Sequence, residues 1–292
     1  MEIGSAPGCE GCPGKDYCKN STQEDKADME KLDLRMKVIQ HKILVMSGKG
    51  GVGKSTVSSL LALGLAEMGF KVGILDVDIC GPSIPKLLNC ENGSIVNKPW
   101  GWVPVTGTNN ILVMSIAFIT GTKETPVIWR GPRKTNMIVR FLKDTYWGKL
   151  DYLVIDTPPG TSDEHLSAVK SLSSSSSFYS LMVTTPQDLS ISTVLRQINF
   201  CSKLKLPLLG IIHNMDGYAC PCCGEICEIF EHGMCDKELE KLNVKSLGKI
   251  PIDPQICLNG DNGTSIFKDH PNSPLTTSFK QILQQITTLV KS

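Results

Sequence analysis

The segment from residue 48 to residue 56 carries the glycines, lysines and hydroxyl groups of a nucleoside triphosphate site. It reads Gly48-Lys49-Gly50-Gly51-Val52-Gly53-Lys54-Ser55-Thr56, which fits the phosphate-loop (P-loop) pattern of glycine, four residues, glycine, lysine and serine or threonine. Glycines let successive backbone N–H groups face a phosphate, and a following helix directs the positive end of its dipole at the anion. We therefore predict that Lys54 binds the β- and γ-phosphates of ATP and that Ser55 binds Mg²⁺.

Three aspartates lie at the ends of predicted strands. Asp76 and Asp78 follow the apolar run 72–75, and Asp156 follows the run 153–155. Because the carboxyl ends of parallel strands form the ligand edge of an α/β sheet, we expect all three near Mg²⁺ and the γ-phosphate. Asp156 is predicted to bind Mg²⁺ through water, Asp76 to join the metal shell and Asp78 to orient the attacking water. The alternative for Asp76 and Asp78 is a turn in which the carboxylates bond the backbone.

Two groups among the twelve cysteines have the spacing of metal ligands: Cys9, Cys12 and Cys18 near the start, and Cys220, Cys222, Cys223, Cys227 and Cys235 late in the chain. In a reducing compartment, clustered cysteines suit metal better than disulfides. The first group supplies three thiolates where four are usual, so a chance cluster is its alternative. Cys220 and Cys223 would half-fill a site, which Cys227 and Cys235 could complete as a zinc ribbon, or a second subunit could complete with the same pair.

The flanking segments predict the elements that position these groups. The apolar run 43–46 before the P-loop is typical of a buried strand, and 57–68 has the apolar spacing of a helix. Other strands are expected at 72–75, 153–155, 179–183 and 208–212, and other helices at 26–39 and 189–203. The order of strand, glycine loop and helix disfavours a chance glycine-rich turn at 48–56.

Several segments outside the site carry simpler expectations. Residues 91–110, with Trp100 and Trp102, are expected to form a surface insertion, and the serines at 173–177 a flexible connection. A C-terminal amphipathic helix is expected to pack on the core because cationic residues on it are sparse; its apolar residues are Phe279, Ile282, Ile286 and Leu289. The isolated Cys80, Cys90, Cys201 and Cys257 are expected to be small buried hydrophobes.

The whole chain has 292 residues, which is long enough for one large core. Its net charge of +1 gives no bulk electrostatic field that would attract nucleic acid or an anionic membrane. The sequence shows no leader and no run of about 18 apolar residues, so we expect an intracellular, soluble protein. We divide it into a flexible cysteine-containing tail at 1–25, which has few large apolar groups, and one domain at 26–292.

Lys49 resembles the signature lysine of the deviant P-loop ATPases, which include nitrogenase iron protein, the Min and Par partitioning ATPases and the Mrp-type iron-sulfur carriers. Other segments resemble the Mrp and nucleotide-binding-protein branch of this group: Asp78 to Pro85, Trp129 to Lys134, Asp151 to His165 with its switch II turn Pro158-Pro159-Gly160, and Val183 to Gln187. Cys220 and Cys223 match the CPxC motif of that branch. The likeness covers residues 9 to 275 and is to its eukaryotic cytosolic iron-sulfur scaffolds, which carry an N-terminal ferredoxin-like cysteine motif.

This resemblance implies a doubly wound, mostly parallel sheet and a dimer in which Lys49 reaches the partner's nucleotide. It implies that Asn214 hydrogen-bonds the adenine and that Pro251 lines the other side of the base, both in loops at strand ends. It further implies a [4Fe-4S] cluster shared by Cys220 and Cys223 of two subunits, with Cys9, Cys12 and Cys18 as further ligands. The chain departs from the family in lacking a fourth cysteine before Cys9, and in having Ser192 and Thr193 where Leu-Asp is usual.

The function that follows from the resemblance is ATP-dependent scaffolding with slow ATP hydrolysis: [4Fe-4S] clusters assemble on the cysteines and pass to cytosolic and nuclear apoproteins. The expected partners are a second copy or a related scaffold ATPase, apo iron-sulfur proteins and cluster-targeting factors, in the cytoplasm, with the nucleus left open as a second location. Two alternatives remain open at this point: a partitioning-type ATPase with a structural zinc ribbon, and an electron donor like nitrogenase iron protein.

Overall fold

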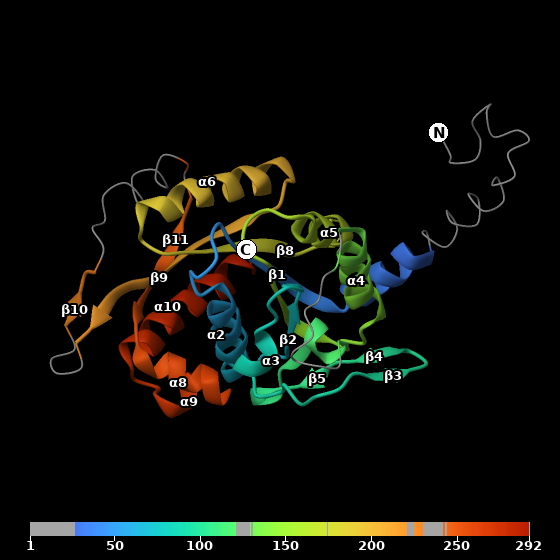
Figure 1. Ribbon diagram of the computed structural model, residues 1–292, viewed down its shortest axis with the longest axis horizontal. Helices are drawn as coiled ribbons and strands as arrows, with labels where there is room; N and C mark the ends of the chain where they lie inside the picture. Colours follow the sequence, from blue (N-terminus) through green and yellow to red (C-terminus); the bar gives the residue numbers. More distant parts are fainter. Residues whose placement is uncertain are drawn as a thin grey trace, which may run out of the picture.

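A computed structural model describes residues 27–120, 129, 131–173, 175–220, 225–229, 242 and 244–291 of the chain. A central twisted sheet lies between two layers of helices (Figure 1). The strands are β1 (Ile39–Ser47), β2 (Val72–Asp76), β3 (Val96–Lys98), β4 (Gly101–Val103), β5 (Val105–Thr106), β6 (Leu112–Ser115), β7 (Leu150–Asp156), β8 (Phe178–Thr184), β9 (Leu208–Ala219), β10 (Ile226–Cys227) and β11 (Ser246–Ile252).

The helices are α2 (Lys54–Glu67), α3 (Ile84–Leu87), α4 (Gly131–Asp144), α5 (Asp163–Leu172), α6 (Asp188–Lys203), α8 (Pro254–Asn262), α9 (Ile266–Asp269) and α10 (Pro274–Leu289). Two short 3-10 turns, Thr108–Asn110 and Ile116–Phe118, flank β6. Residues 27–37 are also helical and lead into β1. Among the described residues, no helix is long and apolar enough to span a membrane.

The main sheet has the strand order β10-β9-β8-β1-β7-β2-β6-β5, and β11 also pairs with β9. Its central strands run parallel, whereas β5 pairs antiparallel with β6 and β10 pairs antiparallel with β9. β1 lies between β7 and β8, so the loop that follows β1 emerges at the carboxyl edge beside the ends of both neighbours. This is the mostly parallel, doubly wound arrangement that the sequence predicts.

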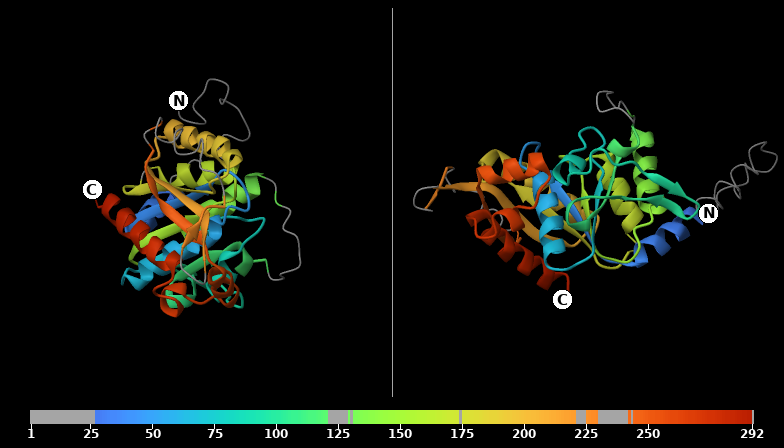
Figure 2. Two further views of the ribbon diagram at one scale, coloured as in Figure 1. Left: turned by 90° about the vertical axis from the view of Figure 1, so that its left-hand side faces the viewer. Right: turned by 90° about the horizontal axis from the view of Figure 1, so that it is seen from below.

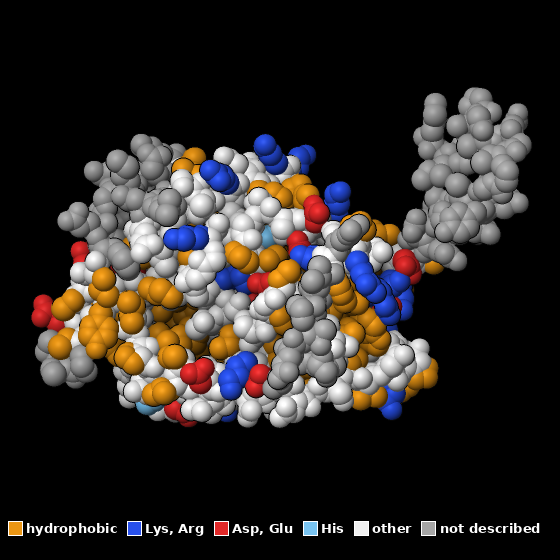
Figure 3. All heavy atoms as spheres, in the orientation of Figure 1, with side chains coloured by type: hydrophobic (Ala, Val, Ile, Leu, Met, Phe, Trp, Pro, Cys, Tyr) orange, Lys and Arg blue, Asp and Glu red, His pale blue; other side chains and the backbone are white. Residues whose placement is uncertain are grey.

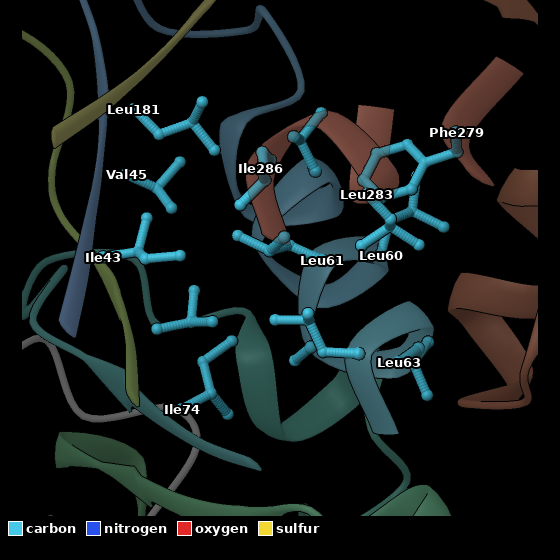
Figure 4. Packing of buried hydrophobic residues seen from close by; sticks show 14 of the residues in the cluster. Ile43, Val45, Leu60, Leu61, Leu63, Ile74, Leu181, Phe279, Leu283 and Ile286 are labelled. Atoms are coloured by element: carbon cyan, nitrogen blue, oxygen red, sulfur yellow. The ribbon is translucent and has the colours of Figure 1, made fainter. Parts of the chain in front are cut away.

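Alternation along the strands divides the core into two clusters, one on each face of the sheet. In β1, Ile43 and Val45 face α2, α3, α9 and α10, whereas Leu44 and Met46 face helix 27–37, α4, α5 and α6. Figure 4 shows the first cluster, in which side chains of β1, β2 and β8 meet those of α2 and α10. Each fully buried side chain of this size stabilises the fold by about 1.5–3 kcal/mol, so both faces hold the strand ends in place.

Several element boundaries differ from the sequence prediction. The predicted helix 26–39 ends at residue 37, because Ile39 already belongs to β1. Leu32 and Met36 pack inward from this helix, whereas Met29 is 47% exposed. The predicted strand 208–212 continues to Ala219, because its second half pairs with β11 and β10. The C-terminal helix packs on the core as predicted, with Phe279, Ile282 and Ile286 buried.

The insertion at 91–110 is more ordered than the sequence suggests. β3 and β4 form a two-stranded ribbon, and β5 adds to the edge of the main sheet. Trp100 is 55% exposed, but Trp102 packs edge-on against Phe141 and beneath the guanidinium of Arg140. The prediction for the isolated cysteines is also partly wrong, since Cys90 and Cys201 are buried but Cys80 and Cys257 are exposed.

Candidate nucleotide site and cysteine hairpin

The P-loop lies between the end of β1 and the start of α2, as the sequence predicts. Gly51 and Gly53 adopt φ angles of 81° and 79°, in the left-handed region that favours glycine. A Cβ on Gly53 would also overlap the amide of Asn214. The backbone turn and the close approach of β9 therefore both require glycine at position 53.

The buried carboxylate of Asp156 binds three polar side chains from the first turns of α2. It accepts hydrogen bonds from Lys54 Nζ at 2.7 Å, Ser55 Oγ at 2.6 Å and Ser58 Oγ at 2.7 Å. Lys54 is 6% exposed and Asp156 is fully buried, so the ion pair is shielded from water. The structure thus brings together the predicted phosphate ligand, the predicted Mg²⁺ hydroxyl and the Walker B carboxylate.

Asp76 and Asp78 add further negative charge beside this pair. Asp76 is fully buried, aligns with Asp156 on the neighbouring strand, and accepts from Ser115 Oγ and from the N–H of Asp78, both at 3.1 Å. Burial and then the charge of Asp156 hold the pKa of Asp76 well above its usual range, and burial also raises the pKa of Asp78.

Three carboxylates therefore share the one ammonium of Lys54 within this cluster, and the pKa values of Asp76 and Asp78 are raised because burial and the neighbouring carboxylates disfavour their charged forms. A divalent cation placed here would favour those charged forms. Carboxylate and hydroxyl oxygens are the ligands that Mg²⁺ prefers. The donor set fits the divalent ion, with Ser55 and Asp156 as the residues that would hold it. When bound, such an ion neutralises charge on the phosphates.

A hollow of about 440 Å³ opens next to the P-loop, lined by Gly53, Thr56, Asn214, Pro251 and Pro254 among others. Hydrophobic side chains gather on this face over β9, α8 and α10 (Figure 3). Its size and apolar lining suit a nucleobase. Asn214 Nδ2 donates to the carbonyl of Val52 at 2.9 Å, so the amide is fixed by the P-loop itself.

The loop placement expected for Asn214 and Pro251 is wrong: Asn214 lies within β9 and Pro251 within β11. Two irregularities make this possible. Met215 has a φ of 59°, which kinks β9 after Asn214. The register between β11 and β9 shifts between Ile250 and Ile252, so Pro251 falls where its missing N–H interrupts no ladder.

The other predicted site residues lie around this centre. Lys49 is exposed, so its ammonium is free to meet another subunit, and its action in trans stays a prediction. Gly48 packs so tightly against Thr193 of α6 that a Cβ there would overlap the threonine. Thr193 Oγ1 donates to the carbonyl of Ser190 at 2.6 Å.

The segments after β2 and β7 are joined by a side chain of α4. Lys134 Nζ donates to Glu164 Oε1 at 2.9 Å and contacts Cys80 Sγ at 3.2 Å. The hydrogen bond to Glu164 raises the pKa of Lys134. Cys80 lies two residues after Asp78, and Glu164 lies in the first turn of α5, after the switch II turn, so one lysine connects the segment after β2 with the segment after β7. Arg130 of the same motif lies outside the described residues.

Cys220 and Cys227 belong to a hairpin of β9 and β10 at one end of the long axis, far from helix 27–37 (Figure 2). Cys220 follows β9, and its N–H donates to Glu225 O at 2.8 Å; Cys227 lies on β10 opposite Tyr218. Cys220 is half-buried and Cys227 is exposed. Cys222, Cys223 and Cys235 lie outside the described residues, as do Cys9, Cys12 and Cys18 of the tail. Within the described ranges, no three His, Cys, Asp or Glu side chains are arranged so that they could hold a metal ion by themselves.

The model of the family described as NUBPL iron-transfer P-loop NTPase, within the ParA group, matches residues 38–287. The chain therefore belongs to the iron-transfer P-loop NTPases. Membership confirms the resemblance and the fold class drawn from the sequence, and it makes ATP hydrolysis the expected reaction class.

Individual members and structural neighbours agree with this assignment. A cytosolic Fe-S cluster assembly factor NUBP2 homolog of Dictyostelium discoideum is 50% identical over 250 residues, which are 85% of this chain and 94% of that protein. The nucleotide-binding protein of Archaeoglobus fulgidus, solved with ADP, is 38% identical with a TM-score of 0.71, covering 80% of this chain and 91% of that one. MinD of Pyrococcus horikoshii, solved with Mg-ADP, is 24% identical with a TM-score of 0.62 over 85% of this chain and 96% of that one, which shows the fold alone.

Sequence reasoning missed three polar residues that organise the site. Ser58 bonds Asp156, Ser115 bonds Asp76, and the buried Gln197 bonds the end of β1. Ser58 lies one turn after Lys54, and Ser58 and Ser59 interrupt an otherwise apolar run from Val57 to Leu63, so that polar interruption is a usable signal. Gln197 belongs to no motif, and its role depends on how α6 packs.

Proposed function

We propose that this chain is an ATP-dependent scaffold that assembles [4Fe-4S] clusters and transfers them to cytosolic and nuclear apoproteins. The observation that carries the proposal is the 50% identity to a cytosolic Fe-S cluster assembly factor over nearly its whole length. The described cysteine of the CPxC pair, Cys220, adds support because it directly follows β9 in the hairpin that β9 forms with β10 and is half-buried, so its thiol could serve as a soft ligand for a cargo cluster.

ATP hydrolysis follows from the arrangement of the chain's own residues. Lys54 leaves Asp156 to bind the β- and γ-phosphates, and Ser55 and Asp156 would hold Mg²⁺. Asp78, half-buried beside this pair, orients the attacking water. Lys49 completes the site from a second subunit. Hydrolysis is slow in this scheme because no arginine finger can be named in the sequence.

The link between nucleotide and cargo is strand β9. Asn214, at the base hollow, and Cys220, directly after β9, lie six residues apart along a segment that kinks at Met215, so at most about 20 Å separates them. We infer that a change at the nucleotide reaches the cysteines through this strand. A cluster shared by Cys220 and Cys223 of two subunits sits on a two-fold axis, which closes the ligand set by symmetry.

The proposed assembly is a homodimer or a hetero-oligomer with a related scaffold ATPase. Its proposed clients are apo iron-sulfur proteins and cluster-targeting factors, and the cytosol is the proposed location because the curated relative is named for it. The tail cysteines Cys9, Cys12 and Cys18 would hold a second cluster.

Anaerobic reconstitution with iron and sulfide, with and without ATP, tests the scaffold function. Replacing Cys220 and Cys223 together by alanine should abolish transferable iron, counted by optical and Mössbauer spectra, and should weaken dimerisation. The matched double variant Cys227→Ala with Cys235→Ala should keep both. If the protein instead carries one tightly held zinc that depends on Cys227 and Cys235, and no iron at Cys220, the scaffold function is wrong and the zinc ribbon of a partitioning-type ATPase replaces it.

A further inference from the structure

A buried glutamine joins helix α6 to both the P-loop strand and switch II. Gln197 is 1% exposed. Its Nε2 donates to the carbonyl of Ser47 at 2.9 Å and to the carbonyl of Gly160 at 2.7 Å. Because both partners can only accept, the nitrogen of the amide must face them. One side chain therefore connects the last residue of β1 with the turn that follows Asp156.

The same carbonyl of Ser47 also accepts the N–H of Gly160 at 2.8 Å. Its two lone pairs are thus both used, one by Gly160 and one by Gln197. Gly160 has a φ of 81°, and the preceding Pro159 lies near Gly50 of the P-loop. In this arrangement the N–H of Gly160 is turned onto the end of β1 and is not offered to a phosphate.

The Gln197 amide is only half satisfied. Among the described residues, its Oε1 is buried and has no hydrogen-bond partner. A purely structural buried amide is normally bonded at both ends, because the unpaired group loses its bonds to water. A second contact holds α6 in place. Thr193, one turn before Gln197 on α6, packs against Gly48, so α6 can stay packed against the end of β1 when the turn 157–160 moves.

We propose that Gln197 is a positioning residue that holds switch II in its ADP or nucleotide-free place and so sets how strongly the site distinguishes ATP from ADP. The proposal rests on the ATP-dependent function above. For residues 157–160 to contact a γ-phosphate, Gly160 must leave Ser47, and the bond from Gln197 to Gly160 breaks at the same time. ADP lacks the γ-phosphate and makes no such demand.

The thermodynamic consequence has a definite sign. A contact present in one state and absent in the other shifts the equilibrium by its own strength. Losing the Gln197 donor should therefore favour the ATP arrangement by about fivefold to tenfold, the worth of one net hydrogen bond. The affinity for ADP should not change. In wild type the bond from Gln197 to Gly160 is present both without nucleotide and with ADP, and in the variant it is absent from both states.

The test compares Gln197→Leu with Gln285→Leu. Gln285, on α10, likewise donates from a helix to a single strand carbonyl, Leu247 O at 2.9 Å, but it is remote from the P-loop. We expect Gln197→Leu to bind the non-hydrolysable analogue AMPPNP about fivefold to tenfold more tightly with ADP affinity unchanged. Hydrogen exchange of peptides covering 157–163, without nucleotide, should rise by a similar factor. Gln285→Leu should change neither.

Gln197→Glu provides a second variant with a different readout. Its carboxylate cannot donate, so near neutral pH it should behave as Gln197→Leu does. Burial raises the pKa of such a carboxyl, and the protonated form donates one bond, so the exchange rate should return toward wild type as pH falls. Equal shifts in AMPPNP and ADP affinity, or unchanged hydrogen exchange at 157–163 in both variants, would overturn the proposed role of Gln197. Neither nucleotide affinity nor hydrogen exchange depends on iron, so a failure of cluster transfer and a failure of the Gln197 proposal are separate results.

Discussion

At the scale of the residue, Lys54 and Lys49 have opposite environments and should have separable effects. Lys54 is buried against Asp156, whereas Lys49 is exposed. Lys54→Ala removes charge-assisted bonds to phosphate worth about 3 kcal/mol, so ATP should bind about 100-fold more weakly. Lys49→Ala should bind ATP normally and lose turnover. Calorimetry and phosphate release measure the two quantities.

Stability needs a parallel measurement, because Lys54→Ala also leaves Asp156 buried without its cation, at a cost of about 3–5 kcal/mol. Melting temperature distinguishes unfolding from lost phosphate contacts. Lys49→Ala, as a surface change, should stay within about 0.5 kcal/mol of wild type. Turnover equal to wild type in Lys49→Ala would remove its assignment in trans.

Asp78 offers a second prediction at this scale. Asp78→Asn keeps the side-chain shape and the bond from the Gly81 N–H, 3.3 Å from the carboxylate oxygen, but loses the negative charge that orients water. Turnover should fall about 100-fold while ATP still binds, and bound ATP should be recovered intact after gel filtration. Normal turnover would assign the role to another carboxylate.

At the scale of the element, the start of α5 carries a pH-sensitive cap. His165 Nδ1 accepts from the N–H of Ser162 at 3.3 Å in a capping box. The ring is fully buried, and burial lowers the pKa of His165 from 6.5 to about 4. Between about pH 4 and pH 6.5, His165 therefore stays neutral in the folded state, whereas it binds a proton in the unfolded chain.

The sign of the pH effect follows from this difference. The stability contributed by neutral His165 is complete above pH 6.5 and is lost as pH falls toward 4, by about 1.4 kcal/mol per pH unit. Denaturant unfolding at a series of pH values should show this slope in wild type. In His165→Gln the slope between these pH values should flatten, and an unchanged slope would mean that another group controls acid stability.

At the scale of the whole molecule, sequence patterns predict best where spacing and covalent order decide the structure. The P-loop, Asp156 and the positions of the main strands along the chain follow from glycine spacing and apolar runs. Tertiary pairing decides the remainder: β9 extends past Ile212 because β10 and β11 pair with it, and Cys80 and Cys257 are exposed because of where their loops and helices pack. Gln197 could not be found from sequence, since its two carbonyl partners lie 150 and 37 residues away.

The placement of Asn214 and Pro251 inside strands has a thermodynamic consequence for nucleotide exchange. A hollow built from two paired strands is ordered before the base arrives, so docking of adenine costs little conformational entropy. The adenosine half of ATP and ADP should then bind with similar, rapid kinetics. The free energy that distinguishes the two nucleotides is left to the phosphate side, where segments can rearrange, and the lifetime of each bound state is set there and not at the base.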